Sequence, residues 1–287
     1  MNRLLFTYIF IIAFAYFTNN ASGEAWLMQK HKGMFIFSNE IRTFNAIDET
    51  GKYNNDRRFV QDLLNIYMEY GLTNRITLVG KIIAINSMLT SNNAFLGKIK
   101  EKSLGIDTFN ISLRHGIIRN NQIIALSIVT GFETPSIYHE NRASQFAIKK
   151  YKQISGLEVG INFDKNSFFI LTSNFYLNIN HWYNELRFDA LYGHYFLESI
   201  LFMVRMQKIF YYIHNSKNEF YNKINTSIYD TWVNSGFAKI QMSFLVPFSK
   251  ALSLEFGIYS TIKSKILKTQ NLNTKMRGFY LSLLFEF

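Results

Sequence analysis

Large apolar and polar residues alternate along most of this sequence, with a period of two rather than 3.6. In LEVGINF, Leu157, Val159 and Ile161 share one face, and Glu158 and Asn162 share the other. Sustained alternation predicts two-faced β-strands, and about twelve such segments can be marked. They cover residues 32–44, 60–71, 75–86, 105–116, 122–132, 150–163, 167–179, 183–194, 199–211, 233–246, 252–262 and 276–287.

The connections between these segments alternate in length. Short connections lie at 72–74, 117–121, 164–166, 195–198 and 247–251, and longer ones at 45–59, 87–104, 133–149, 212–232 and 263–275; only 180–182 is short where a long one is expected. The segments have about the length of the 9–11 residues with which a tilted strand crosses a bilayer. We therefore predict an all-β fold, a transmembrane antiparallel β-barrel of about 12 strands with short periplasmic turns and long extracellular loops.

A soluble β-sandwich explains the two faces of these segments less well. The apolar faces carry bulky Phe, Leu, Ile and Met at nearly every position, and the opposite faces carry charged residues in mid-strand. In a closed barrel the apolar face meets lipid, the charged face lines the lumen, and no strand edge is left unpaired in hydrocarbon.

The beginning of the chain has the features of a secretory signal. Arg3 precedes an apolar run over residues 4–17, and the small residues Ala21, Ser22 and Gly23 follow. The run is too short for a membrane-spanning helix. We expect a signal peptide over residues 1–23 and a barrel over residues 24–287, with Glu24 as the first mature residue.

Charged side chains on the non-apolar faces are the candidate lumen residues. They are Glu69, Lys81, Asp107, Arg114, Glu158, Glu185, Arg187, Asp189, Arg205, Lys239, Glu255 and Glu286. Two roles remain open: the opposite charges pair and brace the wall, or they line a narrow conduit and select solutes. Glu185, Arg187 and Asp189 form the densest group, predicted as a constriction or a salt-bridge ladder.

Composition narrows the chemistry further. The sequence has no Cys, 2 Pro and 6 His, and the histidines are scattered without metal-ligand spacing, so we expect no cofactor and no metal site. The formal charge is +11. Its basic residues gather in predicted loops: Lys98, Lys100, Lys102, Lys149, Lys150, Lys152, Lys263, Lys265, Lys268, Lys275 and Arg277. With a signal peptide, lipopolysaccharide and outer-membrane lipid are expected partners rather than nucleic acid; a general Lys bias explains the clusters equally well.

The last predicted strand ends on a phenylalanine. Phe279, Leu281, Leu283, Phe285 and Phe287 fall on its apolar face. Terminal aromatic residues at this spacing resemble the signal read by the machinery that inserts outer-membrane barrels. Phe287 is equally explained as the last lipid-facing residue, and the two interpretations are compatible.

Several segments resemble a family of bacterial outer-membrane barrels named for the meta pathway of phenol degradation and regarded as transporters. They are EAWLMQKHKGMFIFSNEIRTF, LLNIYMEYGLTNRITLVG, FETPS and VPFSKALSLEFGIYS, of which MEYGLTNRITL is the most specific. Ser136 departs from the Gly expected there. The resemblance implies a barrel of this size that admits small hydrophobic or aromatic compounds, and it carries over no site residues.

Our first functional prediction is therefore a passive channel for small compounds, and not an enzyme. The alternative is a structural or adhesion-type surface barrel that acts through its loops. A third hypothesis is an outer-membrane lipid hydrolase, for which HNSKNEF offers His214, Ser216 and Asn218 in a predicted loop.

Overall fold

The computed structural model describes residues 27–47, 53–93, 97–118, 123–134, 137–138, 151–179, 183–196, 199–213, 231–262 and 277–287. The predicted signal peptide lies outside these ranges. Thirteen strands are described: β1 (Gly33–Ile47), β2 (Tyr53–Gly71), β3 (Ile76–Asn93), β4 (Gly97–Ile118), β5 (Ile124–Thr134), β6 (Ile137–Tyr138), β7 (Lys152–Asn162), β8 (Ser167–Asn178), β9 (Tyr183–Phe196), β10 (Ile200–Ile213), β11 (Thr231–Pro247), β12 (Leu252–Ile262) and β13 (Arg277–Glu286).

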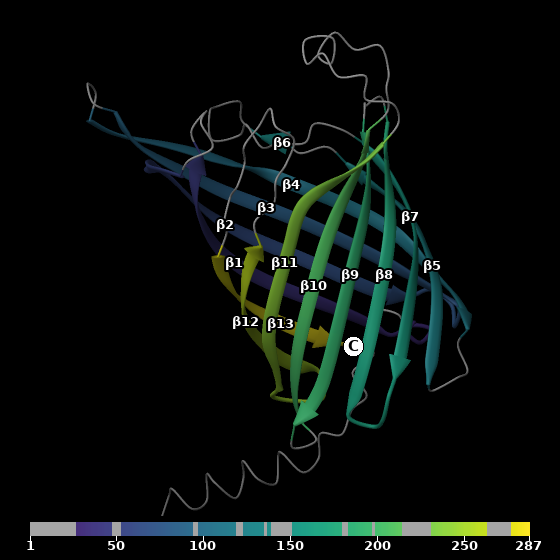
Figure 1. The fold of residues 1–287 in the computed structure, drawn as a ribbon. Helices are drawn as coiled ribbons and strands as arrows, with labels where there is room; N and C mark the ends of the chain where they lie inside the picture. The colour runs from purple at the N-terminus through teal and green to yellow at the C-terminus, as the bar shows by residue number, and fades with distance from the viewer. Residues whose placement is uncertain are drawn as a thin grey trace, which may run out of the picture.

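The strands form one antiparallel sheet that closes on itself (Figure 1). Each strand pairs with its neighbour in the order β3-β2-β1-β13-β12-β11-β10-β9-β8-β7-β5-β4, and the β3–β4 pairing completes the ring. The two-residue β6 pairs with β4 outside this ring. In the described part of the chain, setting β6 apart leaves twelve wall strands, so the predicted fold class is confirmed. No helix among the described residues is long and apolar enough to cross a membrane.

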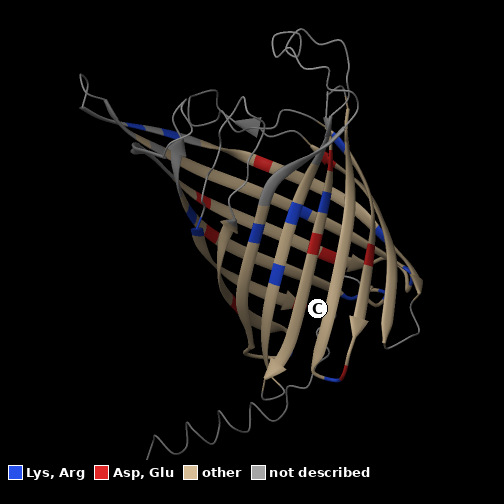
Figure 2. Ribbon diagram, in the orientation of Figure 1, with Lys and Arg blue, Asp and Glu red and all other residues tan. Residues whose placement is uncertain are grey.

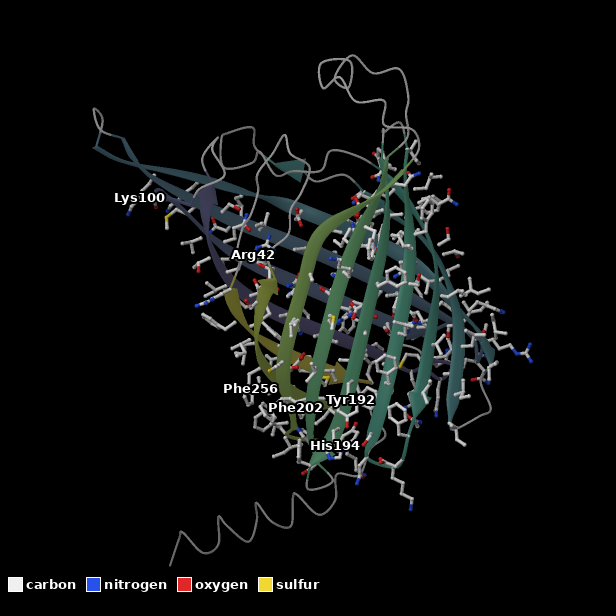
Figure 3. All side chains as sticks on the ribbon, in the orientation of Figure 1. Arg42, Lys100, Tyr192, His194, Phe202 and Phe256 are labelled. Carbon is white, nitrogen blue, oxygen red and sulfur yellow. The ribbon has the colours of Figure 1, made fainter. Side chains whose placement is uncertain are left out.

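The outer face of the barrel is apolar, as the alternation predicts. Large side chains such as Phe132 (58% exposed) and Ile258 (64%) point away from the lumen. Near the short turns, aromatic rings of neighbouring strands touch in a belt, with Phe202 and Phe244 centroids 5.1 Å apart and Phe244 and Phe256 5.8 Å apart. Figure 3 shows Phe202, Phe256 and Tyr192 on this outer side. An aromatic belt of this kind marks the interface between hydrocarbon and water.

Near the short turns, part of the inner wall is packed rather than polar. Ala125, Phe168, Ile170, Leu191 and Leu201 form a buried cluster across β5, β8, β9 and β10. A Cβ added to Gly193 would lie only 2.3 Å from Phe168 Cζ, so the Phe168 ring needs a glycine at this position. This apolar packing fills one side of the lumen at that end.

The predicted loop at 87–104 is wrong. β3 continues to Asn93 and β4 starts at Gly97, so the described residues of this range belong to two long paired strands that extend past their neighbours (Figure 1). The sequence of this range, rich in Asn, Ser and Lys, lacks alternation because outside the membrane neither face needs to be apolar. The loops predicted at 45–59, 133–149 and 212–232 also overlap strands at their ends, and most of the remaining loop residues lie outside the described ranges.

Phe287 closes the ring between the first and last strands. Its amide donates to the Gly33 carbonyl (3.0 Å), and the Gly33 amide donates to the Phe287 carbonyl (2.9 Å). Its ring stacks on Phe35 with centroids 5.6 Å apart, on the outer face. Phe279, Leu281, Leu283 and Phe285 share that face and are 38–55% exposed. Their role as an insertion signal stays a prediction.

Two variants separate the ring of Phe287 from its backbone. Phe287→Ala keeps both hydrogen bonds and should lower the free energy of unfolding by about 1 kcal/mol through the lost aromatic contact. Deleting the residue also removes two backbone hydrogen bonds and should cost about 2 kcal/mol more. Denaturant titration after refolding into lipid vesicles measures both. If both variants lose the same free energy of unfolding in vesicles, the backbone role is contradicted. If both variants assemble poorly in cells to the same degree while refolding differently in vesicles, an insertion signal is supported.

Candidate functional site: the charged lumen

Arg114 is the centre of a buried ion triad on the inner wall. Its Nη1 lies 2.9 Å from Glu69 Oε1, and its Nε lies 2.5 Å from Glu158 Oε2. Tyr67 donates its hydroxyl to the same Glu69 oxygen. The three charges come from β2, β4 and β7, which are separated by β3 and β5, so one guanidinium ties together five strands. Arg114 and Glu69 side chains are each only 3% exposed.

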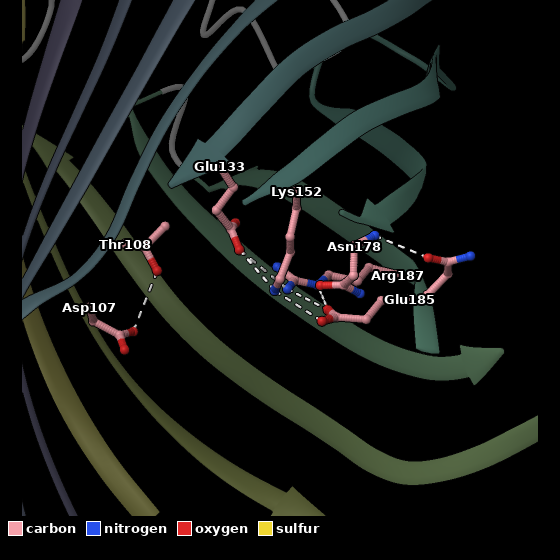
Figure 4. Close-up of polar contacts among 8 residues, drawn as sticks. Asp107, Thr108, Glu133, Lys152, Asn178, Glu185 and Arg187 are labelled. Carbon is pink, nitrogen blue, oxygen red and sulfur yellow. Dashed lines mark hydrogen bonds and ion pairs between the residues drawn. The ribbon is translucent and has the colours of Figure 1, made fainter. Parts of the chain in front are cut away.

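A second cluster joins β5, β7 and β9 (Figure 4). Lys152 Nζ lies 3.0 Å from Glu133 and 2.9 Å from Glu185, and Arg187 binds Glu185 through Nε at 2.8 Å. The Arg187 guanidinium also stacks on the Tyr176 ring at 3.9 Å. Lys152 lies in the predicted strand 150–163, but its grouping with the lysines of the surface loops is wrong, because this side chain is 1% exposed inside the barrel.

The predicted group of Glu185, Arg187 and Asp189 is divided between two partners. Glu185 and Arg187 pair with each other, whereas Asp189 binds Arg205 of β10, with Arg205 Nε 2.8 Å from both carboxylate oxygens. Gln207 donates to Asp189 at 2.6 Å. Figure 2 shows charged positions along the middle of β9, β10 and β11. The arrangement is a ladder of ion pairs, one within β9 and one between β9 and β10.

The facing wall, formed by β11, β12, β13 and β1, carries charges held by tyrosines. Lys239 Nζ lies 3.7 Å from Glu40 and 3.9 Å from the centre of the Tyr259 ring. Gln241 donates to the Tyr280 hydroxyl, which in turn donates to Glu255 at 2.8 Å. Gly278 and Gly257 leave room for these rings, since a Cβ on either would lie about 2.5–2.6 Å from ring atoms of Tyr259 or Tyr280.

The segment before β1 folds into the lumen at the short-turn end. A turn with Lys32 donating to Gln29 (2.9 Å) reverses the chain, and His31 adopts φ 65° within it. The Met28 amide then donates to Thr77 Oγ1 at 3.1 Å, on the inner wall next to Arg114. Leu27 lies against inward-facing Gly116, where a Cβ would meet its Cδ1 at 2.4 Å. The segment therefore covers part of the wall that holds the Arg114 triad.

The remaining predicted lumen residues have less buried positions. Lys81 faces the lumen in register with Tyr67 and Asn110 and is exposed. Asp107 lies in a β-bulge, where Thr108 donates to it at 3.5 Å, and Glu286 is exposed at the short-turn rim. Glu133 and Glu40 were missed. Glu133 shares parity with the inward residues Ser127 and Gly131, a signal that would have placed it in the lumen, but it was assigned to a loop.

The ion pairs differ in how far they face the water of the lumen. The Arg187 and Arg205 side chains are 29% and 28% exposed, whereas Glu185 is 2% exposed. Buried charges of both signs are tolerated in the wall because they are paired, and removing one partner would leave the other as an uncompensated buried charge. The Arg187 and Arg205 guanidinium groups are therefore partly exposed on the lumen side, and Lys81 is exposed there. The inner wall thus combines buried ion pairs with a partly exposed, charged surface.

The hydrolase candidates His214, Ser216 and Asn218 lie outside the described residues. A serine–histidine contact does occur at the short-turn rim, where Ser167 Oγ is 2.9 Å from His194 Nδ1. Asp164 accepts from Ser167 at 3.4 Å rather than orienting the imidazole, which is not the order of a catalytic triad. A hydrogen bond from the Asn166 amide holds the pKa of the Asp164 carboxyl below its usual value.

No cluster of three or more possible metal ligands is found among the His, Cys, Asp and Glu residues that the structure describes. Fold, outer face and lumen together define a transmembrane β-barrel of the bacterial outer-membrane type.

No protein-family model matches the sequence, and no curated protein matches it. Among solved structures, the chain is similar to the COG4313 outer membrane channel from Pseudomonas putida F1, with a TM-score of 0.65 and 10% identity over 94% of this chain and 100% of that chain. The KdgM porin in complex with disordered oligogalacturonate matches with a TM-score of 0.46 and 8% identity, over 88% of this chain and 99% of that chain. The Pseudomonas putida toluene transporter TodX matches with a TM-score of 0.43 and 5% identity, over 88% of each chain. At these identities, the first likeness shows a shared fold.

Proposed function

We propose that this protein is a passive channel of the bacterial outer membrane for small compounds. The observation that carries the proposal is the charged inner wall of a closed membrane barrel, where the Arg187 and Arg205 side chains are partly exposed and Lys81 is exposed. A barrel whose only task is anchorage needs no water-accessible cations inside. The shared fold with a protein described as an outer membrane channel supports the same conclusion.

The solute class we propose is small hydrophobic or aromatic compounds. The resemblance of MEYGLTNRITL and its neighbouring segments to the phenol-degradation family implies such solutes. Inside the barrel, Arg187 lies over the buried Tyr176 ring and Lys239 over the buried Tyr259 ring, both at 3.9 Å. The Arg187 guanidinium is 29% exposed, and a flat aromatic molecule can stack on such a cation.

Planar-bilayer recording tests both levels of the proposal. The purified barrel should give stepwise ion currents, and phenol or catechol added to one chamber should reduce those currents briefly as the molecules enter the lumen. Heat-denatured protein is the control for bilayer leakage. Currents that ignore aromatic compounds would reject the solute class but keep the channel.

A bilayer that stays sealed despite folded, incorporated protein would reject the channel itself. That result would favour a surface barrel acting through its loops, the second candidate function. The extended β3–β4 hairpin, which projects beyond the neighbouring strands (Figure 1), is the observation in its favour.

A further inference from the structure

The bulge in β4 decides which way the lysines of the long hairpin point. On the short-turn side of the bulge, here called below it, Ser112 and Arg114 face the lumen and are buried. Thr108 pairs with Ile83, but the next rung pairs Ile106 with Ala84, so Asp107 is an extra residue. One extra residue exchanges the two faces of the strand beyond it. Even-numbered residues from Ile106 onward therefore lie on the outer face instead of the inner one.

The outer face of β4 consequently changes from apolar to basic along one strand. His115, Leu113, Ile111 and Phe109 are exposed below the bulge, Ile106 (39%) and Leu104 (66%) follow above it, and exposed Lys102 and Lys100 come next. Lys100 projects from the hairpin at the upper left of Figure 3. From His115 to Leu104 the strand rises about 36 Å at roughly 3.3 Å per residue. At a tilt near 45° this spans about 25 Å, the height of the apolar band of such barrels.

The same transition occurs on β13. Leu283, Leu281 and Phe279 are exposed on the outer face, and exposed Arg277 occupies the next outward position at the end far from the short turns. One carboxylate, Asp62 of β2, also lies on this outer face, where Asn39 donates to it at 2.8 Å. The three cations outnumber this one carboxylate. The outward-facing residues of β4 and those of β13 both end in positive charge at the loop end.

We infer that Lys100, Lys102 and Arg277 bind the phosphate groups of lipopolysaccharide in the outer leaflet. These cations stand where the lipid-facing band ends, which is the depth of the anionic headgroup layer. Charge complementarity there contributes roughly fivefold in affinity for each cation. The inference rests on the proposed location in the bacterial outer membrane.

Matched triple variants test this inference in the refolded full-length barrel. The rim variant is K100Q/K102Q/R277Q, and its control is K165Q/K250Q/R75Q, which removes the same charges from exposed positions at the short turns. Melting is followed by heat-modifiable gel mobility during titration with lipopolysaccharide. The half-saturating concentration should rise about 100-fold for the rim variant, in line with three such contacts, and stay unchanged for the control. Dephosphorylated lipopolysaccharide should act on the unmodified protein as weakly as the intact lipid acts on the rim variant.

A rim variant that responds like the control, or dephosphorylated lipid that acts as strongly as intact lipid, would overturn the inference. The ion currents of the same preparations are recorded in parallel. If the unmodified protein gives ion currents but no response to lipopolysaccharide, the lipid site alone is rejected, whereas a lipid response without currents rejects the channel alone.

Discussion

Replacing Arg114 with methionine is expected to lower the free energy of unfolding by about 3–5 kcal/mol, because it leaves two buried carboxylates without their cation. Glu69 and Glu158 both depend on this guanidinium, at 2.9 and 2.5 Å. Methionine keeps much of the side-chain volume, so the loss reports charge rather than a cavity. Denaturant titration in lipid vesicles, followed by heat-modifiable mobility, measures the change. Lowering the pH should narrow the difference, since protonation of the stranded carboxyl groups relieves their burial as charges.

Two further variants make this expectation specific. The triple variant E69Q/R114M/E158Q removes all three charges and should recover most of the lost stability, because a buried ionic group replaced as a whole is often nearly neutral. Lys81→Met removes an exposed lumen cation on the neighbouring strand and should cost less than about 1 kcal/mol. If the single Arg114 variant is no less stable than Lys81→Met, the triad does not brace the wall.

The alternation in the sequence was enough to predict the barrel fold and, for most charged residues of the strands, which face they lie on. Alternation tells which residues share a face, and it placed Arg114, Glu158 and Glu185 on the inner side. It does not tell which strands those residues reach across, since that depends on how far each strand is staggered against the next. The five-strand reach of Arg114 and the division of Asp189 from Arg187 were therefore not predictable.

The errors concern residues at the loop end of the barrel. Lys152 follows Lys149 and Lys150, and the run was interpreted as a solvated loop, although Lys152 has the parity of inward Glu158. The bulge at Asp107 adds one residue to β4. Around it the odd-numbered and even-numbered residues are similarly polar, so the sequence does not show that the two faces exchange. Only the pairing with β3 reveals it, and with it the outward face of Lys100 and Lys102.

Placing alanine at Gly71 is expected to displace the segment before β1 and to increase the ion current. A Cβ at this position would lie 2.1 Å from the Gln29 carbonyl oxygen, a backbone atom that cannot rotate away. The His31 amide donates to the Gly71 carbonyl, and the Gly71 amide donates to the Lys32 carbonyl, both at 2.9 Å. Losing these two bonds should lower the free energy of unfolding by about 1–2 kcal/mol.

Gly80→Ala is the matched control, because its added Cβ would meet only the Met68 Cε, at an ordinary 3.5 Å. Single-channel recording measures the current, and limited proteolysis at Lys30 and Lys32 reports whether the segment has left the lumen. Faster cleavage together with a larger current means that Leu27 and Met28 narrow the passage at the short-turn end. Faster cleavage with an unchanged current would mean that the solute path runs along the facing wall, past Lys239 and Tyr259, and that the segment only covers the Arg114 triad.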